Sequence, residues 1–231
     1  WFRLGDRDLA THLTRTRALN EGASLTEVIA SLAASLGIRQ TVLPMCDQPV
    51  ATMIGTAEGE LAFQHYFVRE RCAPEVTGFR FAGSEGAELA PALKTLLTAP
   101  DLDGIVICPS NPFVSVDPIL AVPGMRAALT AARAPVVAVS PIIQGAAIKG
   151  PTAKMMAELG VPQDALAVAR HYGDLLDGFI LDHHDASLMN DVRSLGQNAI
   201  AAPTLMLTLQ DKMSLARCVI DFIDTITANA R

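Results

Sequence analysis

A short run of polar side chains in the segment 109–120 has the composition of a phosphate-binding loop. It carries Ser110, Asn111 and Ser115 around Pro112 and follows an apolar segment with the pattern of a buried strand. Hydroxyl and amide groups, together with unpaired backbone N–H groups, suit phosphate oxygens or the edge of a polar ring. An ordinary proline-containing turn is the alternative. We favour binding because ligands gather at the carboxyl ends of parallel strands.

A second loop, 140–154, carries two lysines at a predicted helix start. Lys149 and Lys154 flank Gly150-Pro151, where glycine permits close backbone approach and proline suits the first helical turn. Helix N-termini with neighbouring cations bind anions, so these residues predict a diphosphate site. The order of residues is not that of a Walker loop. A solvated pair of lysines is the alternative.

Two acidic and two histidine residues stand together in the run Asp182-His183-His184-Asp185. Adjacent side chains point in different directions, and tetrahedral metal sites use wider ligand spacing, so we interpret the two histidines as loop residues. Asp185 has the type and place of a helix cap. Asp182 and Asp185 are nevertheless the candidates within this chain for holding a hard cation such as Mg²⁺.

Charges of both signs collect near the start of the chain, where Asp6, Arg7, Asp8 and His12 open a predicted helix over 7–20. A self-satisfied cluster of capping groups and ion pairs is the interpretation that physical chemistry alone favours. Asp47 is similarly ambiguous, because aspartate is common in turns.

The elements that position these residues follow an alternating pattern of helix and strand from about residue 86 onward. Apolar segments that alternate with helices predict a parallel sheet covered on both faces, and hence a three-layer, Rossmann-like α/β fold. The predicted strands are 104–108, 135–139, 166–169, 178–181 and 204–207.

The N-terminal part has a different organisation. Ser24 and Glu27 form a capping box that opens a second helix, so residues 1–40 are expected to hold a strand end and a small helical subdomain. Residues 41–231 form the α/β core. Short strands at 42–45, 50–54 and 61–68 place a β-hairpin excursion in the region 50–82.

Composition narrows the class of protein. Half of the 231 residues are hydrophobic and the formal net charge is −6, which disfavours disorder and a nucleic-acid partner. No apolar run reaches the roughly 20 residues needed to cross a membrane. Four widely spaced cysteines without a CxxC pair indicate a reducing compartment, so we expect a cytoplasmic protein.

Four segments resemble one known family, in the same order along the chain. They are LGDRDLATHLTRT (4–16), LPMCDQPVAT (43–52), CPSNPFVSVDPILAVPGMR (108–126) and VSPIIQGAAIKGPTAKMM (139–156). FQHYFV (63–68) resembles a further block of that family. It is the 2-phospho-L-lactate transferase family of deazaflavin coenzyme (coenzyme F-420) biosynthesis, and the resemblance extends to about residue 215.

The resemblance implies an activity and its participants. The ribityl hydroxyl of the deazaflavin Fo would attack the phosphorus that bears the lactyl or enolpyruvyl group of a guanosine-diphosphate-linked donor, releasing GMP. Mg²⁺ and a homodimer would be involved. Phosphoryl transfer depends on positioning and charge neutralisation, which agrees with the loops described above.

The resemblance also assigns roles to individual residues. Catalysis would involve the first helix, and binding the loops and the residues around them. The expected catalytic residues are Asp6, Arg7, Asp8 and His12, and the expected substrate-binding residues are Arg3, Asp47, Ser110, Asn111, Pro112, Ser115, Lys149, Gly150, Pro151 and Lys154.

The chain departs from the family pattern at its start. Members of the family begin with a glycine-rich strand-to-loop turn and an acidic segment. In this sequence both would lie before Trp1, together with the first β-α units of the sheet and the main metal ligands. We therefore expect the isolated chain to be catalytically incomplete. Gln144 replaces a usual Gly and Cys46 a usual Ser, and neither change is expected to be disabling. Two alternatives stay open: another nucleotide-dependent phosphotransferase, and a non-catalytic nucleotide-binding relative.

Overall fold

Helices and strands alternate along the chain in the structure, a computed structural model that describes residues 3–148 and 150–229. The helices are α1 (Asp6–Asn20), α2 (Leu25–Ser35), α3 (Pro91–Leu97), α4 (Asp117–Leu120), α5 (Met125–Ala131), α6 (Thr152–Glu158), α7 (Ala165–Tyr172), α8 (Met189–Arg193) and α9 (Leu209–Asn229). The strands are β1 (Ala51–Thr56), β2 (Gly59–Ala62), β3 (Gly78–Ala82), β4 (Ile105–Ile107), β5 (Val136–Val139), β6 (Ile142–Ile143), β7 (Ala146–Ala147), β8 (Gly178–Asp182) and β9 (Asn198–Ala202).

A four-stranded parallel sheet in the order β4-β5-β8-β9 forms the centre of the fold. All residues of β5 and β8, the two inner strands, are buried. Strands that are covered on both faces need apolar side chains in both directions, which is why these segments are continuous apolar runs. The predicted Rossmann-like α/β class is confirmed.

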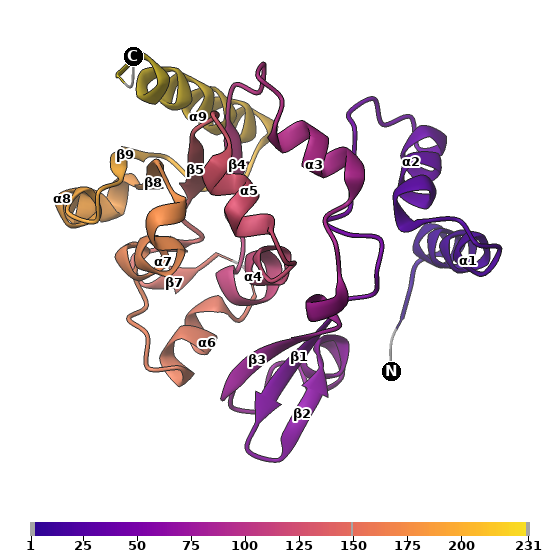
Figure 1. The fold of residues 1–231 in the computed structure, drawn as a ribbon. Helices are drawn as coiled ribbons and strands as arrows, with labels where there is room; N and C mark the ends of the chain where they lie inside the picture. Colours follow the sequence, from indigo (N-terminus) through magenta and orange to yellow (C-terminus); the bar gives the residue numbers. More distant parts are fainter. Residues whose placement is uncertain (1–2, 149, 230–231) are drawn as a thin grey trace.

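Helices cover both faces of this sheet and give three layers (Figure 1). On one face α9 packs against Val137, Val139 and Ile180. On the other face Ala138 and Phe179 belong to the larger core cluster, together with residues of α5 and α7. The carboxyl ends of all four strands therefore point toward the same edge of the sheet, where ligands of such folds gather.

Two smaller units precede the sheet. The strands β1, β2 and β3 form an antiparallel sheet that contains the expected hairpin. Helices α1 and α2 pack against each other, and the predicted capping box is present, with Ser24 accepting from the backbone N–H of Glu27.

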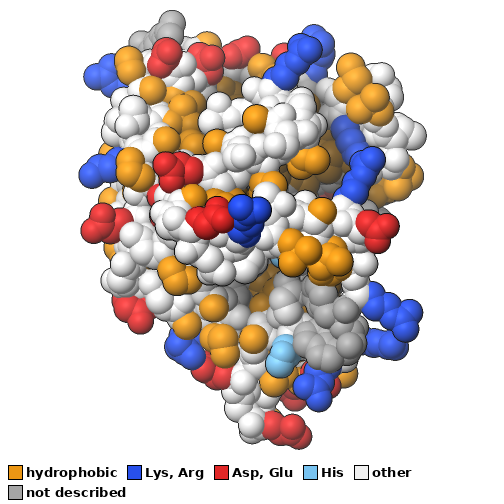
Figure 2. All heavy atoms as spheres, turned by 90° about the vertical axis from the view of Figure 1, so that its right-hand side faces the viewer, with side chains coloured by type: hydrophobic (Ala, Val, Ile, Leu, Met, Phe, Trp, Pro, Cys, Tyr) orange, Lys and Arg blue, Asp and Glu red, His pale blue; other side chains and the backbone are white. Residues whose placement is uncertain are grey.

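Acidic, basic and apolar side chains are interspersed on the face shown in Figure 2. The proposed division into domains at residue 40 stays a prediction.

Several expected strands were wrong. Residues 166–169 belong to helix α7, because Asp164 caps its start by accepting from the backbone N–H of Ala167 at 2.7 Å. The last strand is β9 rather than 204–207, which is an irregular segment. The segment 42–45 has no strand, and 61–68 continues from β2 into a helical turn.

Within the described residues, no single helix is long and apolar enough to cross a membrane. The helical segments Pro112–Leu120 and Met125–Ala131 reach that length and composition only together, with an 83° bend between them. Their side chains Phe113, Val116 and Met125 are buried in the core. All four cysteines are free, as their spacing predicted.

Candidate functional site

A cavity of about 290 Å³ opens at the carboxyl ends of the parallel strands. Its walls come from the segments that follow β4, β5 and β9, and from the start of α9. The lining residues are Pro109, Ser110, Asn111, Ser140, Pro141, Ile143, Ile148, Thr152, Thr204, Leu205, Met206 and Lys212. Because β4 and β5 are neighbours in the sheet, the two loops predicted to act together do meet at one cavity.

The loop after β4 is held in place by Asn111. Its side-chain oxygen accepts from the backbone N–H groups of Phe113 and Val114 at 2.9 and 3.3 Å, and its amide nitrogen donates to the sulfur of Met155 at 3.3 Å. Ser110 lines the cavity, whereas Pro112 is buried beneath the loop and Ser115 is exposed outside the cavity lining. Asn111 therefore positions this loop, and Ser110 is the residue with a hydroxyl group that this loop contributes to the cavity lining.

The loop after β5 contributes two buried polar residues to the cavity lining, Ser140 and Thr152. The Ser140 hydroxyl donates to the carbonyl of Ile142 at 2.9 Å and accepts from its N–H, which closes a tight turn into β6. Gly150 has a φ of +74°, a conformation that favours glycine, and Pro151 precedes α6 as expected. Thr152 is 2% exposed and lines the cavity. Lys149 lies outside the described residues.

Lys154 does not take the place expected for it. Its Nζ donates to the carbonyl oxygen of Pro74 at 3.0 Å, forms an ion pair with Glu158 and lies 5.9 Å from the centre of the Tyr66 ring. Burial opposes the charged form, but the contacts with Glu158 and Tyr66 raise the pKa of Lys154. The amine thus fastens α6 to the segment before β3, and the structure does not bring it to the cavity.

The charged residues of the first helix also stand apart from the cavity. Asp6, Arg7, Asp8 and His12 are exposed on α1, and Arg3 is exposed just before it. Figure 1 shows α1 on the opposite side of the view from β8 and β9. None of these side chains is among the described residues that line the cavity. Their catalytic and substrate-binding roles stay predictions.

Asp47 has a structural partner. Its Oδ1 accepts from the backbone N–H of Thr26 at 2.7 Å and from the Thr26 hydroxyl at 2.8 Å. These bonds satisfy an N–H in the first turn of α2 that lacks a partner within the helix. Asp47 thus ties the helical hairpin to the rest of the chain.

We expect Asp47→Ala to lower the free energy of unfolding by about 1–2 kcal/mol, because it removes both acceptor bonds at the helix start. Urea unfolding followed by circular dichroism measures this loss. Asp101→Ala, at an exposed position, is the matched control and should stay within about 0.5 kcal/mol of the unchanged chain. Equal stability of both variants would contradict the structural role.

Two polar cavity residues outside the predicted loops were missed from the sequence. Lys212 lies in the first turn of α9, and Thr204 lies just after β9. Thr204 was overlooked because 204–207 was predicted to be a strand, which hid the segment that follows the true strand. With β9 at its observed place, the preference of ligands for segments after strand ends indicates Thr204. No motif of residue types around Lys212 singles it out in the sequence.

A compact polar cluster lies at the end of β8, between the cavity walls that follow β5 and β9. Asp182 is 1% exposed, and its Oδ2 accepts from the backbone N–H and the hydroxyl of Thr204, both at 2.9 Å. Its Oδ1 accepts from the His184 backbone N–H at 3.0 Å and lies 2.6 Å from His184 Nδ1. Burial alone would raise the pKa of Asp182, but these hydrogen bonds outweigh it and lower the pKa to about 2.

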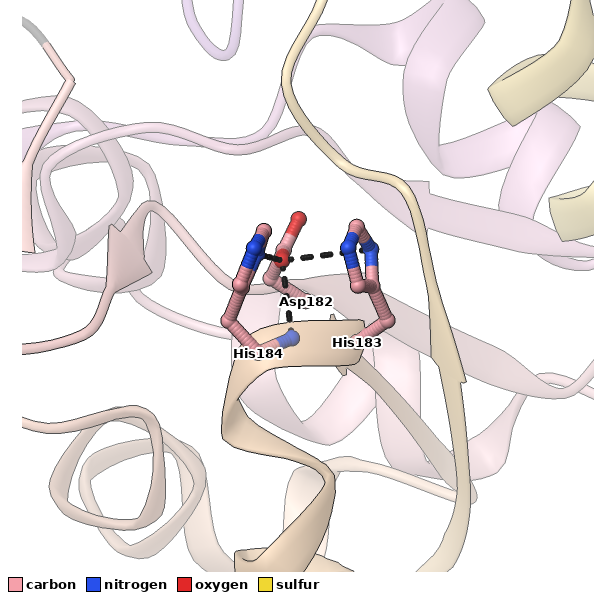
Figure 3. Close-up of side chains that lie close together, drawn as sticks. All are labelled: Asp182, His183 and His184. Atoms are coloured by element: carbon pink, nitrogen blue, oxygen red, sulfur yellow. Dashed lines mark hydrogen bonds and ion pairs between the residues drawn. The ribbon is translucent and has the colours of Figure 1, made fainter.

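The expectation that the adjacent side chains of this run point apart was wrong. Figure 3 shows the imidazole rings of His183 and His184 on either side of the Asp182 carboxylate. His183 Nδ1 lies 3.4 Å from Asp182 Oδ1. Asp185 points elsewhere, and its carboxylate accepts from the backbone N–H of Gln144 at 3.0 Å. The cluster is therefore Asp182 with two histidines rather than two aspartates.

A family model described as "2-phospho-L-lactate transferase CofD" matches residues 1–207. The chain belongs to the CofD family. This confirms the resemblance noted from the sequence, and it confirms the prediction of an enzyme of the transferase class.

Two relatives illustrate the range of this CofD family. A protein of Methanosarcina mazei named 2-phospho-L-lactate transferase is 40% identical over 219 residues, which are 95% of this chain and 71% of the relative. A protein of Streptomyces griseus named phosphoenolpyruvate transferase is 39% identical over 233 residues, which cover 99% of this chain and 73% of the relative.

Solved structures support the fold of this CofD-family chain. A UPF0052 family member from Bacillus halodurans superposes with a TM-score of 0.58 at 16% identity, covering 85% of this chain and 65% of its own. This chain thus spans slightly less than two thirds of that neighbour's length. At this identity the likeness concerns the fold alone.

Proposed function

We propose that this chain takes part in the transfer of a 2-phospholactyl or phosphoenolpyruvyl group from a guanosine-diphosphate-linked donor to the ribityl hydroxyl of the deazaflavin Fo. In this reaction the hydroxyl oxygen bonds to the phosphorus that bears the three-carbon acid. The bond from that phosphorus to the bridging oxygen breaks, GMP leaves with the bridging oxygen, and the hydroxyl proton is released. Membership of the CofD family and relatives named for both kinds of transfer support the proposal.

The cavity at the ends of β4, β5 and β9 is the observation that carries this proposal. Its size is near the lower end of the roughly 300–1,000 Å³ range of small-molecule pockets, which suits the diphosphate and the groups next to it. Ser110 supplies a hydroxyl at one wall and Lys212 a cation at another. Such groups position a diphosphate and offset the charge that develops as the bridging bond breaks.

The place of Lys212 indicates an anionic ligand. Backbone N–H groups give a helix N-terminus a partial positive charge, so a lysine in the first turn of α9 is unfavourable for helix stability. Asp211 already supplies one negative charge to this turn, where its carboxylate accepts from the backbone N–H groups of Leu207 and Thr208. Among the described residues, no carboxylate forms an ion pair with Lys212 itself. A diphosphate in the cavity would give this ammonium group a partner of opposite charge.

The described residues do not offer a magnesium site of the usual kind. Mg²⁺ binds through carboxylate oxygens and water, in a near-octahedral arrangement. Asp182 is the one carboxylate of its cluster, its near neighbours are imidazoles rather than oxygen ligands, and Asp185 is held by Gln144. Mg²⁺, expected from the family resemblance to neutralise the diphosphate, stays a proposal to which no residue is assigned, and so do the homodimer and the cytoplasmic location.

Ligand titrations test the proposal independently of turnover. We expect the chain to quench Fo fluorescence and to bind GDP at least about tenfold more tightly than UDP or ADP, as recognition of one base requires. Ser110→Ala should weaken GDP binding about 3–10-fold, through loss of one hydrogen bond in the cavity. Ser115→Ala, outside the cavity lining, is the control and should bind as the unchanged chain does.

The two alternatives give different results. Preference for UDP or ADP would favour another nucleotide-dependent phosphotransferase. GDP binding without Fo quenching would favour a non-catalytic nucleotide-binding relative. Absence of both GDP and Fo binding would contradict the proposal.

A further inference from the structure

The cluster at the end of β8 gathers nitrogen and oxygen ligands of the type that transition metals prefer. One ligand atom from each of Asp182, His183 and His184 lies within 4.8 Å of the other two. The rings of His183 and His184 are 4.0 Å apart between centroids and tilted by 35°, and both side chains are about half exposed. Incoming ions can therefore reach both imidazoles from solvent.

The hydrogen bonds of Asp182 leave one position on its carboxylate that a cation can take. Thr204 occupies Oδ2 with two donors, and the His184 backbone N–H occupies one lone pair of Oδ1. The remaining partners of Oδ1 are the two imidazoles, with His184 Nδ1 at 2.6 Å and His183 Nδ1 at 3.4 Å. A metal ion would replace the proton between Oδ1 and the His184 imidazole. The hydrogen bonds from the His184 backbone N–H, the Thr204 backbone N–H and the Thr204 hydroxyl would remain. Such supporting bonds fix the orientation of metal ligands.

We propose that Asp182, His183 and His184 form a binding site for a divalent transition-metal ion such as Zn²⁺. Two imidazoles with one carboxylate match the preferences of zinc, and three protein ligands leave an open position for water. Ligand distances of about 2.0–2.2 Å to the metal require side-chain adjustments of roughly 1 Å. This donor set is distinct from the oxygen ligands that Mg²⁺ selects.

The proposed metal site is linked to the cavity through Thr204. Thr204 lines the cavity and also holds the Asp182 carboxylate. A bound cation would thus add positive charge beside the cavity, at the end of the strand between β5 and β9. The metal site itself does not depend on the proposed transferase reaction, and its test needs no substrate.

Zinc affinity of the tag-free 231-residue chain tests the proposal, measured by competition with a chromophoric chelator. We expect one Zn²⁺ per chain with micromolar or tighter affinity, weakened at least tenfold in His183→Gln and in His184→Gln. Co²⁺ bound in place of Zn²⁺ should show the visible absorption bands of an ion with nitrogen and oxygen ligands. These bands should be absent in both histidine variants. Circular dichroism confirms that the variants, altered at half-exposed positions, remain folded.

Two controls separate this site from unspecific binding. His12→Gln removes an exposed histidine on α1, and Asp185→Asn changes the carboxylate next to the cluster, so both should bind Zn²⁺ as the unchanged chain does. Millimolar Mg²⁺ should not displace Zn²⁺. Absence of Zn²⁺ binding, affinity unchanged in both histidine variants, or a loss in only one of them would overturn the three-ligand site.

Discussion

Replacing Asp182 by Asn is expected to destabilise the folded chain by about 2–4 kcal/mol at pH 7, measured with a chelator present. The carboxylate is almost fully buried and accepts hydrogen bonds through both oxygens from Thr204 and His184. The amide of Asn has one accepting oxygen, so at least one buried donor of Thr204 or His184 loses its partner. An unsatisfied buried donor costs about 1–3 kcal/mol.

The effect of this substitution should depend on pH. The pKa of Asp182 is lowered from 3.8 to about 2 in the folded chain, because the donors around it outweigh its burial. A carboxylate with a lowered folded-state pKa stabilises the fold above its unfolded pKa, and this contribution disappears as pH falls through the folded value. The shift corresponds to about 2 kcal/mol at neutral pH. The free energy of unfolding of Asp182→Asn should therefore differ less from that of the unchanged chain at pH 3 than at pH 5, by about 1 kcal/mol.

Urea unfolding at several pH values measures both effects. Asp185→Asn is the matched control, since Asp185 is less buried and accepts from a single backbone N–H, that of Gln144. The Asp185→Asn substitution should lower the free energy of unfolding by less than about 1 kcal/mol at pH 7. Two results would contradict the role assigned to Asp182. One is an equal loss of stability in Asp182→Asn and Asp185→Asn, and the other is a loss in Asp182→Asn that stays the same between pH 5 and pH 3.

The sequence predicted the main architecture because local pattern and tertiary environment agree there. Val136–Val139 and Gly178–Asp182 are apolar on both sides, and they are the two strands that the sheet buries completely. The expectation that the loops after residues 108 and 139 meet follows from the same pattern, since adjacent parallel strands end at one edge. Ser110 and Asn111 could be placed at a cavity for this reason.

The remaining features depend on contacts between distant segments. Lys154 was assigned to the diphosphate from its place at a helix start, but its amine bonds to Pro74, 80 residues earlier in the chain. No local pattern contains that contact. β9 was missed because Asn198–Ala202 is rich in alanine, whereas 204–207 has the more strand-like composition.

The histidine pair illustrates a limit of spacing rules. Neighbouring side chains diverge in a regular strand or helix, but His183 and His184 open a 3₁₀ segment in which Asp182 caps the first turn. Asp182 Oδ1 therefore lies close to a ring nitrogen of each histidine. Only the turn geometry, which residue types do not specify, brings the three groups together.

Lys212→Ala is expected to weaken GDP binding about 10–100-fold, whereas Lys154→Ala should change it less than about threefold. Lys212 is the lysine that lines the cavity among the described residues, and a hydrogen bond between an ammonium group and a phosphate contributes about 1.5–3 kcal/mol. Lys154 is instead held by Glu158 and Pro74.

Isothermal titration calorimetry with GDP compares these two variants directly. The affinity of the unchanged chain should fall as ionic strength rises, and this dependence should be smaller in Lys212→Ala, because one cation facing the phosphates has been removed. Lys154→Ala should show its effect in the stability of the fold, since it leaves the mostly buried Glu158 without its ion-pair partner. If Lys154→Ala weakened GDP binding as much as Lys212→Ala, the diphosphate would have to lie at the start of α6 rather than beside α9.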